Sequence, residues 1–119
     1  ISKQTKKDMS ENILNALNHW KAAWEDKDMS KYLKSYASKF KYPNNMNRFE
    51  WEEYRTSRIT SKKIINLSLS NTKVKFSKEK AVVTFTQNYK SGALNQTSIK
   101  TLVFIEEGND WLILEETSK

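Results

Sequence analysis

The stretch VVTFTQNYKSG, residues 82–92, has the alternation of a β-strand but ends in polar side chains on its more apolar face. Successive side chains of a strand point to opposite faces, so Gln87 and Tyr89 follow an apolar pair on one side. An amide and a phenol in this position have two explanations. They line a cavity that holds a ligand, or they form a polar rim where the sheet leaves the core and meets water.

Other polar and cationic residues are predicted to reach the same region. Lys100 begins a strand face that continues with Leu102 and Phe104, and the helical stretch 47–59 carries two arginines beside its aromatic residues. Such side chains around a half-apolar concavity are suited to a carboxylate- or amide-bearing ligand. The candidate ligand-binding residues on this reasoning are Gln87, Tyr89, Lys100, Tyr54, Arg55 and Arg58. The alternative is that they only close the open end of the sheet.

The residue types that most catalytic and metal sites need are scarce in this sequence. His19 is the only histidine, and its place one step from a helical apolar stripe predicts a boundary or surface position. The chain has no cysteine, which excludes disulfides, thiolate catalysis and cysteine-based zinc sites. Gly92 and Gly108, the two glycines, lie in predicted turns, so a glycine-rich phosphate loop is excluded. We therefore predict no catalytic residue, no metal site and no cofactor.

The composition describes a basic, aromatic-rich domain. The chain has 119 residues with 12% aromatic content, and its mean hydropathy of -0.81 indicates a well-solvated surface. The net charge of +7 favours acidic partners, but the basic residues are scattered and no run exceeds two. We therefore do not predict nucleic-acid binding. No apolar run approaches the roughly 20 residues of a membrane helix, so we predict no membrane insertion.

Helical spacing in the first half and strand-like spacing in the second predict an α+β domain, in which three N-terminal helices pack on a curved, mainly antiparallel sheet. Ser10 is the expected N-cap of the first helix, and Asn47 with Glu50 has capping-box spacing. The expected helices are 10–26, 28–40 and 47–59, and the expected strands are 63–71, 73–76, 80–90, 97–107 and 111–116.

Residues 1–9 are predicted to be a flexible N-terminal segment, and residues 10–119 a single domain. The chain opens ISKQTKK without an initiator methionine. We therefore expect either a processed form or a piece of a larger protein.

Four segments together resemble the nuclear transport factor two-like superfamily. They are HWKAAWEDKDMSKYLKSYASKF, WEEYRTSR, AVVTFTQNYKS and KTLVFIEEGNDWLILEE, and the resemblance extends over about residues 11–116. Within the superfamily the chain looks most like the C-terminal accessory domain of bacterial periplasmic L,D-transpeptidase-related carboxypeptidases, which trim peptidoglycan. The resemblance implies a cone, in which a curved sheet wraps a long helix and leaves a pocket at its open end. It also implies a set of pocket or rim residues that contact a muropeptide: Gln87, Tyr89, Ser91, Lys100 and Glu116.

From this resemblance we expect a non-catalytic binding or positioning domain of a periplasmic, cell-wall-modifying enzyme. Its partners would be a peptidoglycan fragment or its own upstream catalytic domain. Two alternatives stay open. One is self-association or partner docking through the outer face of the sheet, with Thr84, Thr86, Thr101 and Val103 as the contact surface. The other is a small pocket enzyme of the isomerase or cyclase type, which needs a buried acid or base.

Overall fold

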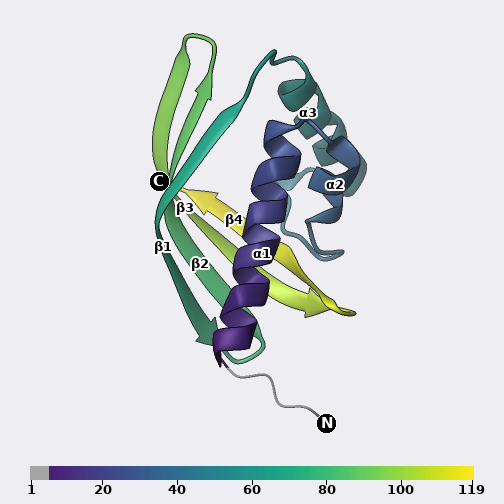
Figure 1. The fold of residues 1–119 in the computed structure, drawn as a ribbon. Coiled ribbons are helices and arrows are strands. Elements are labelled where there is room, and N and C mark those ends of the chain that lie inside the picture. Colours follow the sequence, from purple (N-terminus) through teal and green to yellow (C-terminus); the bar gives the residue numbers. More distant parts are fainter. Residues whose placement is uncertain (1–5) are drawn as a thin grey trace.

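Three helices precede four strands, which confirms the predicted α+β class. The structure is a computed structural model that describes residues 6–119, and Figure 1 shows all its helices on the concave side of one sheet. The elements are α1 (Lys6–Glu25), α2 (Met29–Lys34), the short 3₁₀ helix η1 (Pro43–Asn45), α3 (Arg48–Thr60), β1 (Asn66–Ser77), β2 (Lys80–Ser91), β3 (Leu94–Glu107) and β4 (Asp110–Ser118).

The sheet is an antiparallel meander with the strand order β1-β2-β3-β4. We expected two strands before β2, but β1 is continuous, with a register shift between Ser70 and Lys73. Asn71 has a φ of 53° at this bulge, and asparagine tolerates that conformation better than most residues. β3 begins at Leu94 rather than at the expected residue 97, so the β2–β3 hairpin is longer than predicted.

The helix α1 lies across the concave face of the sheet and supplies the centre of the core (Figure 1). Its predicted apolar stripe is confirmed, because these side chains are all buried: Ile13, Leu17, Trp20 and Trp24. The predicted start was wrong, since α1 begins at Lys6 and Ser10 lies inside it. Of the expected flexible segment 1–9, residues 6–9 are therefore helical, and residues 1–5 lie outside the described part of the chain.

The second helix is shorter than predicted. An aspartate directly before the helical spacing predicts an N-cap, and Asp28 is the N-cap, with a side chain that accepts a hydrogen bond from the backbone N–H of Lys31. The helix ends at Lys34, because the following backbone pairs with β4 instead: Ile113 donates to the carbonyl of Ser35 at 2.8 Å and accepts from the N–H of Ala37 at 2.8 Å. This pairing attaches the segment after α2 to the edge of the sheet.

The predicted capping box at the start of α3 is confirmed. The Asn47 side chain accepts from the N–H of Glu50 at 2.9 Å, and the Glu50 carboxylate accepts from the N–H of Asn47 at 2.9 Å. The buried face of α3 is formed by Trp51 and Ile59. Helical spacing in the sequence also predicts Tyr54, Arg55 and Arg58 on this inner face, and for Tyr54 and Arg58 that prediction is wrong, because both side chains are exposed.

The capping box determines where α3 begins, so its loss should weaken the docking of this helix. We expect Asn47→Ala to lower the free energy of unfolding by about 1 kcal/mol, because an N-cap side chain satisfies a helix N–H that has no other partner. Urea denaturation followed by circular dichroism measures this change. The matched control is Asn18→Ala on the exposed side of α1, which should be neutral or slightly stabilising. Equal stability of the Asn47→Ala variant and the native protein would contradict the assignment.

Candidate functional site

A cavity of about 640 Å³ lies between α3 and the outer half of the β2–β3 hairpin. Trp24 from the end of α1 forms part of its wall, together with Gln87 and Tyr89 from β2. Its described lining contains no carboxylate side chain but five cationic residues, Arg55, Arg58, Lys62, Lys100 and Lys119. We call this cavity the cationic pocket.

A second cavity of about 430 Å³ adjoins the cationic pocket, because both are lined by Trp24, Arg55 and Lys100. It extends toward the buried ring of Trp51 and toward Glu116 at the end of β4. The two cavities therefore form one concave region at the open end of the sheet, and the shared side chains separate a cationic half from a half that contains acidic groups.

A buried ion pair lies between the two halves. The Lys100 ammonium is 2.6 Å from a carboxylate oxygen of Glu116, and only 7% and 19% of these two side chains are exposed. The same ammonium lies over the rings of Trp20 and Trp24, at 5.5 Å and 5.2 Å from their centroids. The negative faces of the two indoles add to the stabilisation of the charge by the carboxylate.

Two tyrosines extend this pair into a hydrogen-bond network. The Tyr36 hydroxyl donates to Glu116 at 2.6 Å, and the hydroxyl oxygens of Tyr36 and Tyr32 are 3.0 Å apart. Arg55 donates from Nε to the Tyr32 oxygen at 3.0 Å, and Trp20 donates from Nε1 to the Tyr36 oxygen at 3.0 Å. Side chains from α1, α3, β4 and the segment around α2 therefore meet in one polar cluster inside an aromatic core.

The number of protons determines the direction of this network. A phenol has one proton, and the ionised Glu116 has none, so the proton in the Tyr36–Glu116 contact comes from Tyr36. The proton between the two hydroxyls must then belong to Tyr32, whose oxygen accepts from Arg55. The donors consequently follow one another from the Arg55 guanidinium through both phenols to the carboxylate, and Lys100 approaches that carboxylate from the other side.

The pKa shifts agree with an ionised carboxylate beside two neutral phenols. Burial alone would raise the pKa of Glu116, but the Lys100 ammonium and the hydrogen bonds from Lys100 and Tyr36 outweigh it, so the pKa lies below the ordinary 4.5. Burial, and after it the negative charge of Glu116, raises the pKa of Tyr32 to about 12 and the pKa of Tyr36 well above 10.0. At neutral pH both tyrosines are therefore neutral donors and Glu116 is ionised.

Gln87 differs from its neighbours because part of its side chain is not satisfied. The residue is 5% exposed, and its Oε1 is buried with no hydrogen-bond partner among the described residues. A buried acceptor without a partner is unfavourable by about 1–3 kcal/mol. Gln87 lines the cationic pocket, so a rotation of its amide that brings this oxygen to the pocket surface would let a ligand N–H or O–H group satisfy it.

Seven of the eight candidate residues from the sequence line the two adjoining cavities: Gln87, Tyr89, Lys100, Arg55 and Arg58 line the cationic pocket, and Tyr54 and Glu116 the second cavity. Ser91 lies at the end of β2 and lines neither. Tyr54 and Arg58 are exposed at the rim, where the Arg58 guanidinium lies 5.4 Å from the Tyr54 ring centroid.

Sequence reasoning missed the polar role of the two tyrosines. The spacing of residues 28–40 predicts Tyr32 and Tyr36 only as members of an apolar helical stripe, whereas in the structure their hydroxyls link Arg55 to Glu116. A signal was present, because tyrosines four residues apart at buried positions need partners for both hydroxyls. Lys62 was also missed, since no periodicity connects a residue just after α3 with the sheet.

His19 is exposed, as predicted, and does not line the cationic pocket. Over residues 6–119 no group of three histidine, aspartate or glutamate side chains is arranged to hold a metal ion. The described helices include none that is both long enough and apolar enough to cross a membrane.

Comparisons with known proteins agree with this architecture. A sequence model described as the Cds6 C-terminal NTF2-like domain matches residues 12–117. Bd1075 of Bdellovibrio bacteriovorus has a similar structure, with a TM-score of 0.84 at 22% identity over 99% of this chain and 44% of that one. The helical cell shape determining protein Pgp2 of Campylobacter jejuni gives 0.82 at 22% identity over 98% and 43%. An NTF2-like protein of unknown function from Pseudomonas putida gives 0.81 at 13% identity over 98% and 89%.

At these identities the solved structures establish the fold alone. The chain spans less than half the length of Bd1075 and of Pgp2. A comparison with curated proteins finds no match.

Removing the cation of the buried pair should destabilise the protein in a pH-dependent way. We expect Lys100→Met to lower the free energy of unfolding at pH 7 by about 3 kcal/mol, because it leaves the Glu116 charge buried and unpaired. In the native protein the depressed pKa of Glu116 contributes stability above pH 4.5, which is lost as the pH falls through the folded-state pKa. In the variant, burial raises that pKa, so the folded state gains relative stability as the pH falls.

The difference between the two proteins should therefore shrink from pH 7 to pH 4, as measured by urea denaturation at each pH. The double variant Lys100→Met/Glu116→Gln should recover most of the loss, since it removes both charges. A deficit that stays constant with pH, or that the second substitution does not relieve, would show that Lys100 acts mainly through packing.

The unpaired oxygen of Gln87 predicts an unusual effect on stability. Gln87→Met keeps an unbranched side chain of similar length and removes the buried acceptor, so it should raise the free energy of unfolding by about 1 kcal/mol. Chemical denaturation measures the change, and Gln96→Met at an exposed position on β3 is the control for methionine itself. A destabilised Gln87→Met variant would show that the amide has a structural role instead.

Proposed function

Because the chain belongs to the family of Cds6 C-terminal NTF2-like domains, we propose that it is a non-catalytic domain that binds and positions an anionic, peptide-like ligand. We propose further that this ligand is a muropeptide, and that the domain is part of a periplasmic, peptidoglycan-modifying enzyme of the L,D-carboxypeptidase type. The observation that carries the proposal is the lining of the cationic pocket, which has five cationic side chains and no carboxylate side chain among the described residues.

The cations of the pocket fall into two groups. Arg55 and Lys100 are engaged in the buried network and are held in place by it. Arg58 and Lys62 make no ion pair with any residue of the described chain, and both lie toward the surface. A ligand carboxylate would therefore pair with Arg58 and Lys62 at the rim of the pocket. The fixed cations Arg55 and Lys100 would add to the positive potential at this position.

Gln87 adds a requirement for the ligand beyond negative charge. Its buried oxygen needs a donor, and a carboxylate provides none. A peptide has N–H groups close to its terminal carboxylate, so it satisfies both the cations and the amide. Simple anions such as phosphate or sulfate satisfy only the cations.

The assignment to peptidoglycan is supported by the resemblance of the chain and by its likeness in fold to Pgp2, a helical cell shape determining protein. Muropeptides have peptide stems with free carboxylates and amide N–H groups, which match the chemistry of the pocket. The chain covers less than half of Pgp2, which fits an accessory domain next to a catalytic one.

The buried carboxylate supports a non-catalytic role. A pocket enzyme of the isomerase type needs a general base with a pKa near the working pH. Glu116 has a lowered pKa, and its two oxygens are already bound to Tyr36 and Lys100. It is therefore a weak base with no oxygen directed at a substrate.

Self-association is a second candidate function, supported by the outer face of the sheet. Thr84, Thr86, Thr101 and Val103 lie on this face and are partly exposed, and none of the helices of residues 6–119 covers it in Figure 1. Ile99 on the same face is 51% exposed. Sedimentation over a range of protein concentrations tests this role, and a strict monomer would rule it out.

A nuclear magnetic resonance titration with a soluble muropeptide tests the main proposal. We expect saturable shifts of the backbone amides of Gln87, Tyr89 and Lys100, and of the Gln87 side-chain amide. The variant Arg58→Gln/Lys62→Gln should weaken binding by about tenfold, because it removes two cations of the pocket that no carboxylate neutralises. The control Lys73→Gln/Lys75→Gln removes the same charge from exposed positions on β1 and should leave the affinity nearly unchanged.

The same muropeptide with amidated carboxyl groups should bind more weakly by a similar factor. Equal losses of affinity in both double variants would mean that binding depends only on the net charge of the protein. No shift at Gln87, Tyr89 or Lys100 would remove the ligand assignment.

A further inference from the structure

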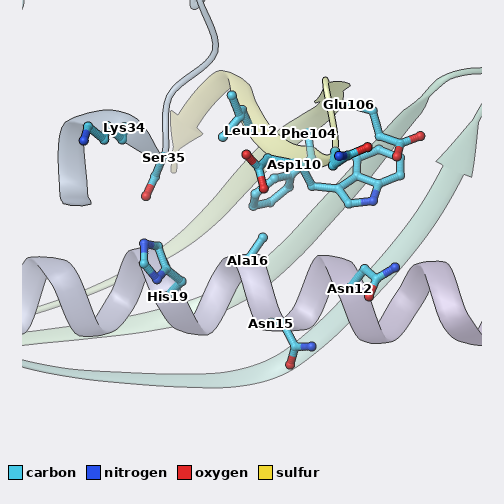
Figure 2. Close-up of a pocket in the computed structure, with 12 residues that line it drawn as sticks. Asn12, Asn15, Ala16, His19, Lys34, Ser35, Phe104, Glu106, Asp110 and Leu112 are labelled. Carbon is cyan, nitrogen blue, oxygen red and sulfur yellow. The ribbon is translucent and has the colours of Figure 1, made fainter. Parts of the chain in front are cut away.

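A third cavity of about 600 Å³ lies between α1 and the β3–β4 hairpin and shares no lining residue with the other two. Figure 2 shows Ala16 and His19 on α1 and, across the gap from them, Phe104, Glu106 and Asp110 on the hairpin. We call this cavity the hairpin groove.

Trp111, which lines the groove, differs from the other three tryptophans. Those three are buried and make aromatic ring pairs: Trp20, Trp24 and Trp51. Trp111 is only partly buried, and within the described chain it has no aromatic ring partner and no hydrogen bond from its indole N–H. The ring packs in part against the core, so the groove contains a partly exposed aromatic surface and an indole donor that has no partner among the described residues.

The polar side chains around this tryptophan are also unused by the fold. Asn12, Asn109, Glu106 and Asp110 line the groove, and their side chains make no hydrogen bond or ion pair with another described residue. Amides both donate and accept, and carboxylates accept strongly. Two carboxylates and Lys34 give this groove a charge balance opposite to that of the cationic pocket, which disfavours an anionic ligand.

We propose that the hairpin groove binds a pyranose unit of a neutral oligosaccharide. One face of a pyranose ring consists of C–H groups, which pack on an indole, and its hydroxyls both donate and accept. The amides and carboxylates around Trp111 are matched to such hydroxyls. The hairpin groove is a separate cavity from the cationic pocket and has the opposite charge balance, so this proposal does not depend on the proposed muropeptide ligand.

A titration with chitotetraose, a neutral tetramer of N-acetylglucosamine, tests the site. The tryptophan indole N–H resonances report on it directly, and Trp111→Phe identifies the one that belongs to Trp111. We expect chitotetraose to shift the Trp111 indole and the Asn12 and Asn109 side-chain amides, and to leave the Trp24 indole unchanged. Trp111→Ala should weaken binding by at least about tenfold, and Trp111→Phe by less because it keeps a flat ring.

Two further variants keep the test independent of folding. Asn12→Ala and Asp110→Asn change exposed groups, so both proteins should fold, and each should weaken binding severalfold. Phe49→Ala removes an aromatic ring that is 68% exposed on α3, away from the groove, and should leave the affinity unchanged.

Three results would overturn the proposal. The first is no saturable shift of the Trp111 indole resonance up to about 10 mM chitotetraose, a concentration at which a site with millimolar Kd is mostly filled. The second is an equal shift with a carboxylate-bearing peptide. The third is a loss of affinity in Phe49→Ala that equals the loss in the groove variants. Shifts at Gln87 and Lys100 report on the cationic pocket separately, so failure at one site is distinguishable from failure at the other.

Discussion

The Lys100–Glu116 ion pair is the interaction on which the open end of this fold depends. Either charge alone would be strongly unfavourable there, because removing an ion from water costs several kcal/mol. Together, with Tyr36 donating to the carboxylate and Trp20 and Trp24 facing the ammonium, both are stabilised. The network reaches through Tyr32 to Arg55 on α3, so one set of polar contacts connects the last two strands to the helices that cover them.

The change from core to pocket along β2 follows from the length of α1. Trp20 packs on Phe85 with ring centroids 6.2 Å apart, and Trp24 packs on Tyr89 at 5.6 Å. The helix ends one residue later, so it cannot cover the face beyond this point. Gln87 lies between these two contacts and is itself buried, and Tyr89 is the last residue of this face that α1 contacts, so the face opens into the cationic pocket here.

Sequence periodicity predicted the helices, the sheet and most of the side chains that meet at the open end, because each of these depends on local spacing. It predicted the capping box of Asn47 and the cap of Asp28 for the same reason. The end of α2 could not be predicted, because it depends on pairing with Ile113, about 80 residues away. The partners of Lys100 and Tyr36 are also long-range, so the sequence indicated a polar region but not which groups neutralise each other.

The network has a consequence for any ligand of the cationic pocket. Lys100 and Arg55 are held by protein partners, so they lose little conformational freedom when a ligand binds, but their charge is partly neutralised already. A ligand carboxylate must therefore gain most of its attraction from the cations that Glu116 does not neutralise. The hairpin groove has the opposite character, with carboxylates and amides around an aromatic ring. A polymer with neutral sugars and anionic peptide branches presents both chemistries, and no single small anion does.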